Sequence, residues 1–166
     1  MGGYDLRMTR PVDDEGQIDY GPAVFLDAED LAEEGVLEAY REIAPLLGEH
    51  GVRARPMTEN FERSSGNYSI DFDGHRYVIT GPGGAEGSWE SQADAWGLAT
   101  CALFDTVNRQ LAGTDVRFFA ISGGNDLHGI FMSAAQAERA RHALPRKTDW
   151  PYLPEPEPPW FGQPHG

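Results

Sequence analysis

Asn125, Asp126 and His128 form the run best suited to chemistry, since an amide, a carboxylate and an imidazole lie close together in the sequence. Asp126 and His128 are two positions apart, which on a strand puts both side chains on one face as a possible acid–base or metal-binding pair. A small metal- or His/Asp-dependent hydrolase is therefore one alternative. Neither a nucleophile nor a third partner lies nearby in the sequence, and Asn and Asp in turns commonly bond the backbone instead. We therefore expect no catalytic residues and a protein that is not an enzyme.

Other familiar patterns of catalytic or cofactor-binding residues are missing from the sequence. The five histidines form neither HExxH nor HxH, and the single cysteine, Cys101, excludes both an internal disulfide and a zinc site built from several cysteines. Gly81–Gly84 precedes a predicted helix, as a phosphate-binding loop does. No Lys-Ser/Thr pair follows these glycines, however, and Pro82 removes one backbone donor. We expect no cofactor and no bound metal.

An excess of acidic residues is the strongest functional indication. The 27 Asp and Glu residues against 13 Lys and Arg give a formal charge of −14. Nucleic-acid phosphates and anionic membranes repel such a chain, so we expect neither as a partner. Residues 1–42 alone hold 12 acids and 3 arginines, which leaves a charge of −9 in a quarter of the chain. Solubility can account for this charge, but a concentrated acidic surface also attracts a basic protein over a long range.

Acidic side chains therefore make up most of the candidate contacts with a basic partner. Nucleases are basic because their clefts hold nucleic acid, and an acidic face can occupy such a cleft. The candidates lie in an N-terminal loop, at the start of the first predicted helix and at the tip of the second predicted hairpin: Asp13, Asp14, Glu15, Glu29, Asp30, Glu33, Glu34, Asn125 and Asp126. A DNA mimic that regulates a DNA-binding protein is a further alternative. The sequence leaves the oligomeric state open.

The length of the chain suits one domain of ordinary size. Hydrophobic residues make up 40% of the 166, which is enough for a core. No apolar run approaches the roughly 20 residues of a membrane span, and the N-terminus lacks a signal-peptide pattern, so we expect a cytoplasmic protein. We assign residues 1–148 to a single domain. Residues 149–166 form a tail whose six prolines exclude helix and inner strand, but whose aromatic residues indicate that part of it docks.

Two hairpins supply most of the strands that we expect. In residues 68–79, the central Asp73-Gly74 favours a two-residue type I′ turn. That turn sets the cross-strand pairs on the core-facing side: Phe72 with His75, Ile70 with Tyr77, and Tyr68 with Ile79. Apolar runs at 116–121 and 127–132, joined by a Gly-rich link, indicate a second hairpin. A run at 4–9 suggests an N-terminal strand, and an apolar run at 23–26 suggests either a second strand or the approach to a helix.

Helices are expected to cover these strands. Apolar residues with helical spacing from Val36 to Leu47 predict the first, with Gly35 splitting off an acidic first turn and Pro45 kinking the last. A second stripe from 93 to 111, with Ser88 or Ser91 as N-cap, predicts a long helix, and Ser133 caps a third over 134–144. The sequence thus predicts an α+β fold: a mainly antiparallel sheet of two hairpins plus an N-terminal strand, covered by two or three helices.

The second hairpin and its flanking helices resemble part of a known family. Residues 118–127 read FFAISGGNDL, and residues 129–133 lead into the Ser-capped helix. The preceding helix adds Trp89, Ala93, Phe104 and Asn108. In this pattern, roughly residues 66–144 resemble immunity proteins of bacterial polymorphic-toxin systems. The resemblance implies a small α+β protein that binds and inhibits a cognate toxin without catalysis. It transfers no catalytic residues, because these families share no general active site.

Overall fold

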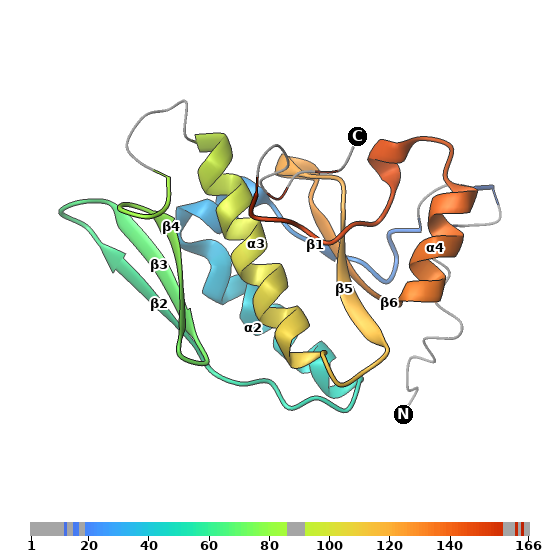
Figure 1. Ribbon diagram of the computed structural model, residues 1–166, viewed down its shortest axis with the longest axis horizontal. Helices are drawn as coiled ribbons and strands as arrows, with labels where there is room; N and C mark the ends of the chain where they lie inside the picture. The colour runs from blue at the N-terminus through green and yellow to red at the C-terminus, as the bar shows by residue number, and fades with distance from the viewer. Residues whose placement is uncertain are drawn as a thin grey trace.

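Two antiparallel sheets lie on either side of a layer of helices (Figure 1). The computed structural model describes residues 12, 15–16, 19–85, 92–157, 162 and 164. The first sheet has the strand order β2-β3-β4, formed by Met57–Glu62, Asn67–Phe72 and His75–Thr80. The second sheet has the order β1-β6-β5, formed by Val24–Phe25, His128–Ser133 and Val116–Ile121.

The α+β class is confirmed, but the strands are distributed differently from the prediction. The two hairpins lie in separate sheets instead of sharing one, and each gains a third strand. Strand β2, which extends the first hairpin, was not predicted, whereas β1 lies within the predicted run at 23–26. The strand predicted over 4–9 lies outside the described residues.

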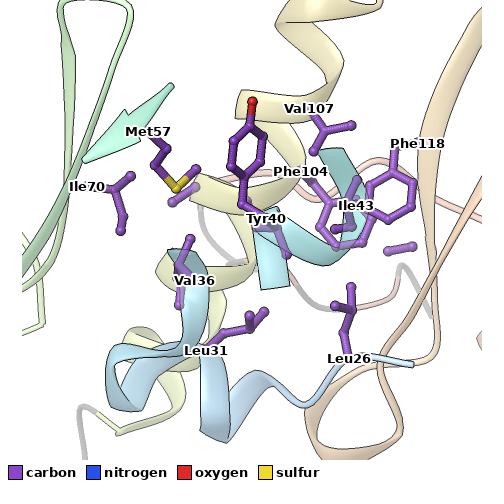
Figure 2. Packing of buried hydrophobic residues seen from close by; sticks show 14 of the residues in the cluster. Leu26, Leu31, Val36, Tyr40, Ile43, Met57, Ile70, Phe104, Val107 and Phe118 are labelled. Atoms are coloured by element: carbon purple, nitrogen blue, oxygen red, sulfur yellow. The ribbon is translucent and has the colours of Figure 1, made fainter. Parts of the chain in front are cut away.

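Helices α2 (Val36–Gly48) and α3 (Gln92–Gln110) pack against each other between the two sheets. Helix α3 contacts β4 on one side and β5 on the other, while α2 contacts β2 (Figure 1). Helix α2 continues past Pro45, and the predicted N-caps of α3, Ser88 and Ser91, lie outside the described residues. Figure 2 shows how side chains from both helices and both sheets meet in one core, with Tyr40, Phe104 and Phe118 among them.

The register of the β3-β4 hairpin follows its turn. Asp73 and Gly74 have φ angles of 53° and 77°, as a type I′ turn requires. The predicted pairs Phe72 with His75 and Ile70 with Tyr77 are confirmed. The third was wrong: Tyr68 pairs with Thr80, because an irregularity between Tyr68 and Ser69 shifts the register. His75 is exposed, whereas its partner Phe72 is 1% exposed, so the pair next to the turn is buried only on the β3 side.

Both faces of the β5-β6 hairpin are buried. Phe118 and Phe131 join the main core, whereas Phe119, Ile130 and Met132 form a second cluster on the opposite face. Helix α4 (Ala134–Ala143) follows β6 directly and contributes Ala137 to that cluster. The Ser133 cap is confirmed, since its hydroxyl accepts from the Gln136 N–H at 3.2 Å. Near-continuous apolar runs in β5 and β6 follow from burial on both faces.

Part of the C-terminal tail lies along the edge of β5. Ala120 and Tyr152 exchange two backbone hydrogen bonds of 2.8 and 3.0 Å. The Tyr152 side chain is 5% exposed, and its hydroxyl donates to the Ser122 carbonyl at 2.6 Å. In Figure 1 this dark red segment crosses between α3 and β5.

Candidate partner-binding groove

An open groove of about 500 Å³ runs along the start of the helical layer. We call it the acidic groove and define it by its lining residues: Phe25, Leu26, Asp27, Asp30, Leu31, Glu33, Glu34, Gly35, Glu38, Ala39 and Glu42. Six of these carry carboxylates, and none is Lys, Arg or His. The groove therefore concentrates negative charge, which a positively charged segment can neutralise.

An irregular turn between two helical segments places these acids together. Helix α1 (Ala28–Asp30) is capped by Asp27, whose carboxylate accepts from the Glu29 N–H at 2.9 Å. The chain then leaves regular helical geometry over Leu31–Gly35, where Glu34 takes a φ of 69°. Gly35 is required here, because a Cβ at this position would lie 2.3 Å from the Asp30 carbonyl oxygen. Glu33 and Glu34 thus reach the groove from a turn instead of a helix.

Side chains of strands β2 and β3 bind the start of α2, directly after this turn. Gly35 supplies no side-chain cap to α2, and the first free backbone donors are bound by Tyr68 and Glu59 instead. The Val36 N–H donates to the Tyr68 hydroxyl at 3.2 Å, and the Leu37 N–H donates to Glu59 Oε2, also at 3.2 Å. Tyr68 in turn donates to Glu59 at 2.5 Å. Burial and the neighbouring Glu59 carboxylate raise the pKa of Tyr68 far above its usual value, so it stays a donor.

An exposed aromatic side chain is among the residues that line the acidic groove. The Phe25 side chain is 61% exposed and lines the groove, whereas Leu26 and Leu31 are buried and point into the core (Figure 2). The His128 ring lies next to two aromatic rings: its centroid is 5.3 Å from that of Phe25 and 4.6 Å from that of Tyr20. The groove thus combines charge with exposed apolar surface.

The structure brings together some of the predicted contact residues and separates others. Asp30, Glu33 and Glu34 line the acidic groove. Glu29 lies beside it and accepts from the Asn125 amide at 3.4 Å, so the hairpin tip and the first helical segment meet. Glu15 and Asp126 are exposed but do not line the groove. Asp13 and Asp14 lie outside the described residues.

Sequence reasoning missed the exposed Phe25 and three of the six carboxylates of the groove: Asp27, Glu38 and Glu42. A signal for two of them was present, since Asp30, Glu34, Glu38 and Glu42 recur at four-residue steps. In a helix such residues lie one above another on a single face. Phe25 had no signal of its own, because an apolar residue in a short run reads as core.

The possible acid–base pair at the hairpin tip does not form in the way that its spacing suggested. Asp126 ends a short helical turn, Gly124–Asp126, and is not part of β6, which begins at His128. The bond of His128 Nδ1 is to the backbone carbonyl of Asp126, at 2.7 Å, as in a turn. Within the described residues, no three His, Cys, Asp or Glu side chains are grouped to hold a metal ion. The hydrolase alternative therefore gains no support from this tip.

A second groove, of about 550 Å³, lies over β2, β3 and β4. Its charges are mixed: Glu59 and Glu62 stand beside Arg76, whose guanidinium is paired with Asp71 at 2.7 Å. Although this groove is slightly larger, it lacks the single sign of charge that would select a partner. The acidic groove is therefore the better candidate site.

Comparison of the chain with protein-family models, with curated proteins and with solved structures gives no significant match. Among the described helices, none has the length and apolar character to cross a membrane.

Proposed function

We propose that this protein is an immunity protein, a non-enzymatic acidic inhibitor that binds a basic protein toxin through the acidic groove. The observation that carries the proposal is the lining of this groove, with six carboxylates and no basic side chain. Long-range attraction to such a surface speeds the encounter with a basic protein, and like-charged proteins are rejected.

The exposed aromatic residue indicates what kind of segment would bind. Phe25 is 61% exposed and lies at the groove, so it can pack against an apolar residue of the partner. Aromatic side chains that become buried in an interface commonly carry much of the binding energy, while charges at its rim set orientation and rate. The segment expected in the groove is therefore rich in Lys or Arg and carries an apolar residue beside them.

A neutralisation screen tests the function directly. Products of genes adjacent to the one that encodes this chain are expressed in a bacterial host, with and without this protein. We expect one product to be toxic alone, to be neutralised by co-expression and to co-purify with this chain. A screen in which no neighbouring product is toxic or co-purifies would contradict the proposal. Capture of a DNA-binding protein would favour the DNA-mimic alternative.

Charge reversal in the groove tests the site. The triple variant Glu33→Lys, Glu38→Lys and Glu42→Lys is expected to weaken toxin binding by at least roughly tenfold and to reduce its salt dependence. The matched control, Glu49→Lys, Asp115→Lys and Glu157→Lys, makes the same change in net charge on exposed acids outside the groove. Isothermal titration at several salt concentrations compares the two. Equal weakening by both triple variants would mean that total charge, not the groove, drives binding.

A further inference from the structure

Strand β2 is the longest sheet edge without a partner in the part of the chain that the structure describes. At the β5 edge, the Asn108 side chain bonds the Phe118 backbone at 2.7 and 3.0 Å, and Tyr152 bonds Ala120. At the β4 edge, the Ala85 N–H donates to the Ile79 carbonyl at 2.9 Å. Strand β1 is two residues long, whereas β2 has six and pairs only with β3. An open edge of this length is a template for another strand.

The hydrogen-bonding direction of β2 follows from the turn that joins β3 and β4. The two residues that flank a two-residue turn form a hydrogen-bonded pair, here Phe72 and His75. The backbone N–H and C=O groups of Phe72 therefore point toward β4, and those of Asp71 point toward β2. Asp71 is paired with Thr58, and alternation then directs Thr58, Asn60 and Glu62 toward β3. The Gly66 N–H bond to the Glu62 carbonyl, at 2.8 Å, agrees with this assignment. The N–H and C=O groups of residues 57, 59 and 61 therefore face outward.

We propose that two copies of this chain pair through β2, in a two-fold symmetric antiparallel arrangement that joins two sheets into one of six strands. The outward N–H and C=O groups belong to odd-numbered residues, so each hydrogen-bonded pair across the interface must join an odd-numbered residue of one copy to an odd-numbered residue of the other. Centring the two-fold axis on Asn60 meets this requirement, because Glu59 then pairs with Phe61 of the second copy and Phe61 with its Glu59. A two-fold axis of this kind makes one strand its own complement.

The side chains of β2 fit this register. Centring the axis on Asn60 sets Thr58 opposite Glu62 of the second copy on the solvent-facing side. Centring it on Glu59 would instead place the Glu59 side chains of the two copies opposite each other. Like charges directly opposite each other destabilise a sheet, so the register centred on Asn60 is preferred to the register centred on Glu59. Phe61 is 44% exposed, and an added strand would cover it.

The local charge permits this pairing in spite of the overall charge of −14. Around the outer face of β2, Glu62 and Asp71 are balanced by Arg63 and Arg76, and Asp71 is already bonded to Arg76 at 2.7 Å. Repulsion between two copies is thus a long-range effect of distant acids, which salt screens. We expect added salt to strengthen self-association of this chain and to weaken its binding to the toxin. Because the two effects have opposite signs, the dimer proposal can be refuted without refuting the proposed function, and the reverse.

Disulfide trapping in the full chain tests the register. In Asn60→Cys the two introduced cysteines would face each other across the axis at about 4.5 Å between Cα atoms, within the range for a disulfide. In Thr58→Cys, the control, they would be roughly 14 Å apart. Native Cys101 is 8% exposed and does not compete. We expect mild oxidation to give covalent dimers of Asn60→Cys and few of Thr58→Cys. Equal yields from the two, or none from either folded variant, would overturn the proposal.

A charge test in the native strand needs no cysteine. Thr58→Lys sets a cation opposite Glu62 of the second copy, and Thr58→Glu sets a carboxylate there. We expect the dimer dissociation constant to fall roughly threefold to tenfold in Thr58→Lys and to rise similarly in Thr58→Glu. Sedimentation equilibrium, referred to the monomer mass of 18.3 kDa, measures both. A monomer at every concentration, or equal constants for both variants, would refute the interface.

Discussion

The Tyr68 hydroxyl connects the sheet to the groove at the scale of single atoms. It accepts from the buried Val36 N–H and donates to Glu59, which itself accepts from the Leu37 N–H. Helix starts usually find such acceptors in a neighbouring Ser, Thr, Asp or Asn, whereas α2 finds them on two strands, 22 positions away on β2 and 32 positions away on β3. Removing the hydroxyl leaves a buried donor without a partner.

Tyr68→Phe is expected to lower the free energy of unfolding by about 1–3 kcal/mol, the usual cost of an unsatisfied buried donor. Urea unfolding followed by circular dichroism measures the change. The matched control is Tyr20→Phe, because that side chain is 45% exposed, and its effect should stay within roughly 0.5 kcal/mol. If both variants lost the same stability, the hydroxyl would not act as a cap.

Helix α2, at the scale of elements, carries acids that repel one another. Glu38 and Glu42 are four positions apart, a spacing at which like charges destabilise a helix. Both line the acidic groove, so the arrangement that suits a basic partner weakens the helix on which it is built. Such opposition between stability and function is common at binding sites.

Glu42→Lys converts this repulsion into a favourable Glu38–Lys pair and is expected to raise the free energy of unfolding by roughly 0.5 kcal/mol at low salt. The same change should weaken toxin binding. Thermal unfolding at low and high salt concentration checks the first effect, which should shrink as salt screens the charges. A loss of stability at low salt would show that Glu42 has a stabilising contact elsewhere.

Elements with local signals were predictable from the sequence, and elements defined by distant pairing were not. The Asp73-Gly74 turn and the Ser133 cap depend on neighbouring residues, and both were predicted correctly. Strand β2 reads MTENFE, whose polar residues do not suggest a strand. Its conformation comes from pairing with β3, which lies later in the chain.

The groove was only partly predictable for a similar reason. The acids at 30, 33 and 34 were identified by charge alone, but the turn that gathers them was not. A Glu with a φ of 69° has no signature in the sequence, since few residues other than Gly adopt this conformation. Distant residues Tyr68 and Glu59 hold the start of α2 that follows this turn.

The tail affects the molecule as a whole, because it lies between α3 and β5 and pairs with the edge of β5. Cys101 on α3 is shielded there: burial, with the carboxylates of Asp105 and Glu155, raises its pKa to about 12. The thiolate is the reactive form of cysteine, so this thiol reacts slowly at neutral pH. Tyr152 and Cys101 lie close enough for Cys101 to add to the rise in the pKa of Tyr152 that burial causes.

Tyr152→Ala is expected to lower the free energy of unfolding by about 3–5 kcal/mol and to speed labelling of Cys101 by a thiol reagent. Labelling kinetics in the absence of denaturant give the second effect, and Leu153→Ala, on a side chain that is 42% exposed, is the control. Labelling of Tyr152→Ala at the native rate would mean that the tail does not shield Cys101.

The bonds between Ala120 and Tyr152 also have a consequence for biosynthesis. Tyr152 follows Ala120 by 32 positions, so β5 leaves the ribosome well before the segment that covers its edge. During that interval the Ala120 backbone groups are open to pairing with other nascent chains. Fast translation through residues 121–152 would shorten this vulnerable period.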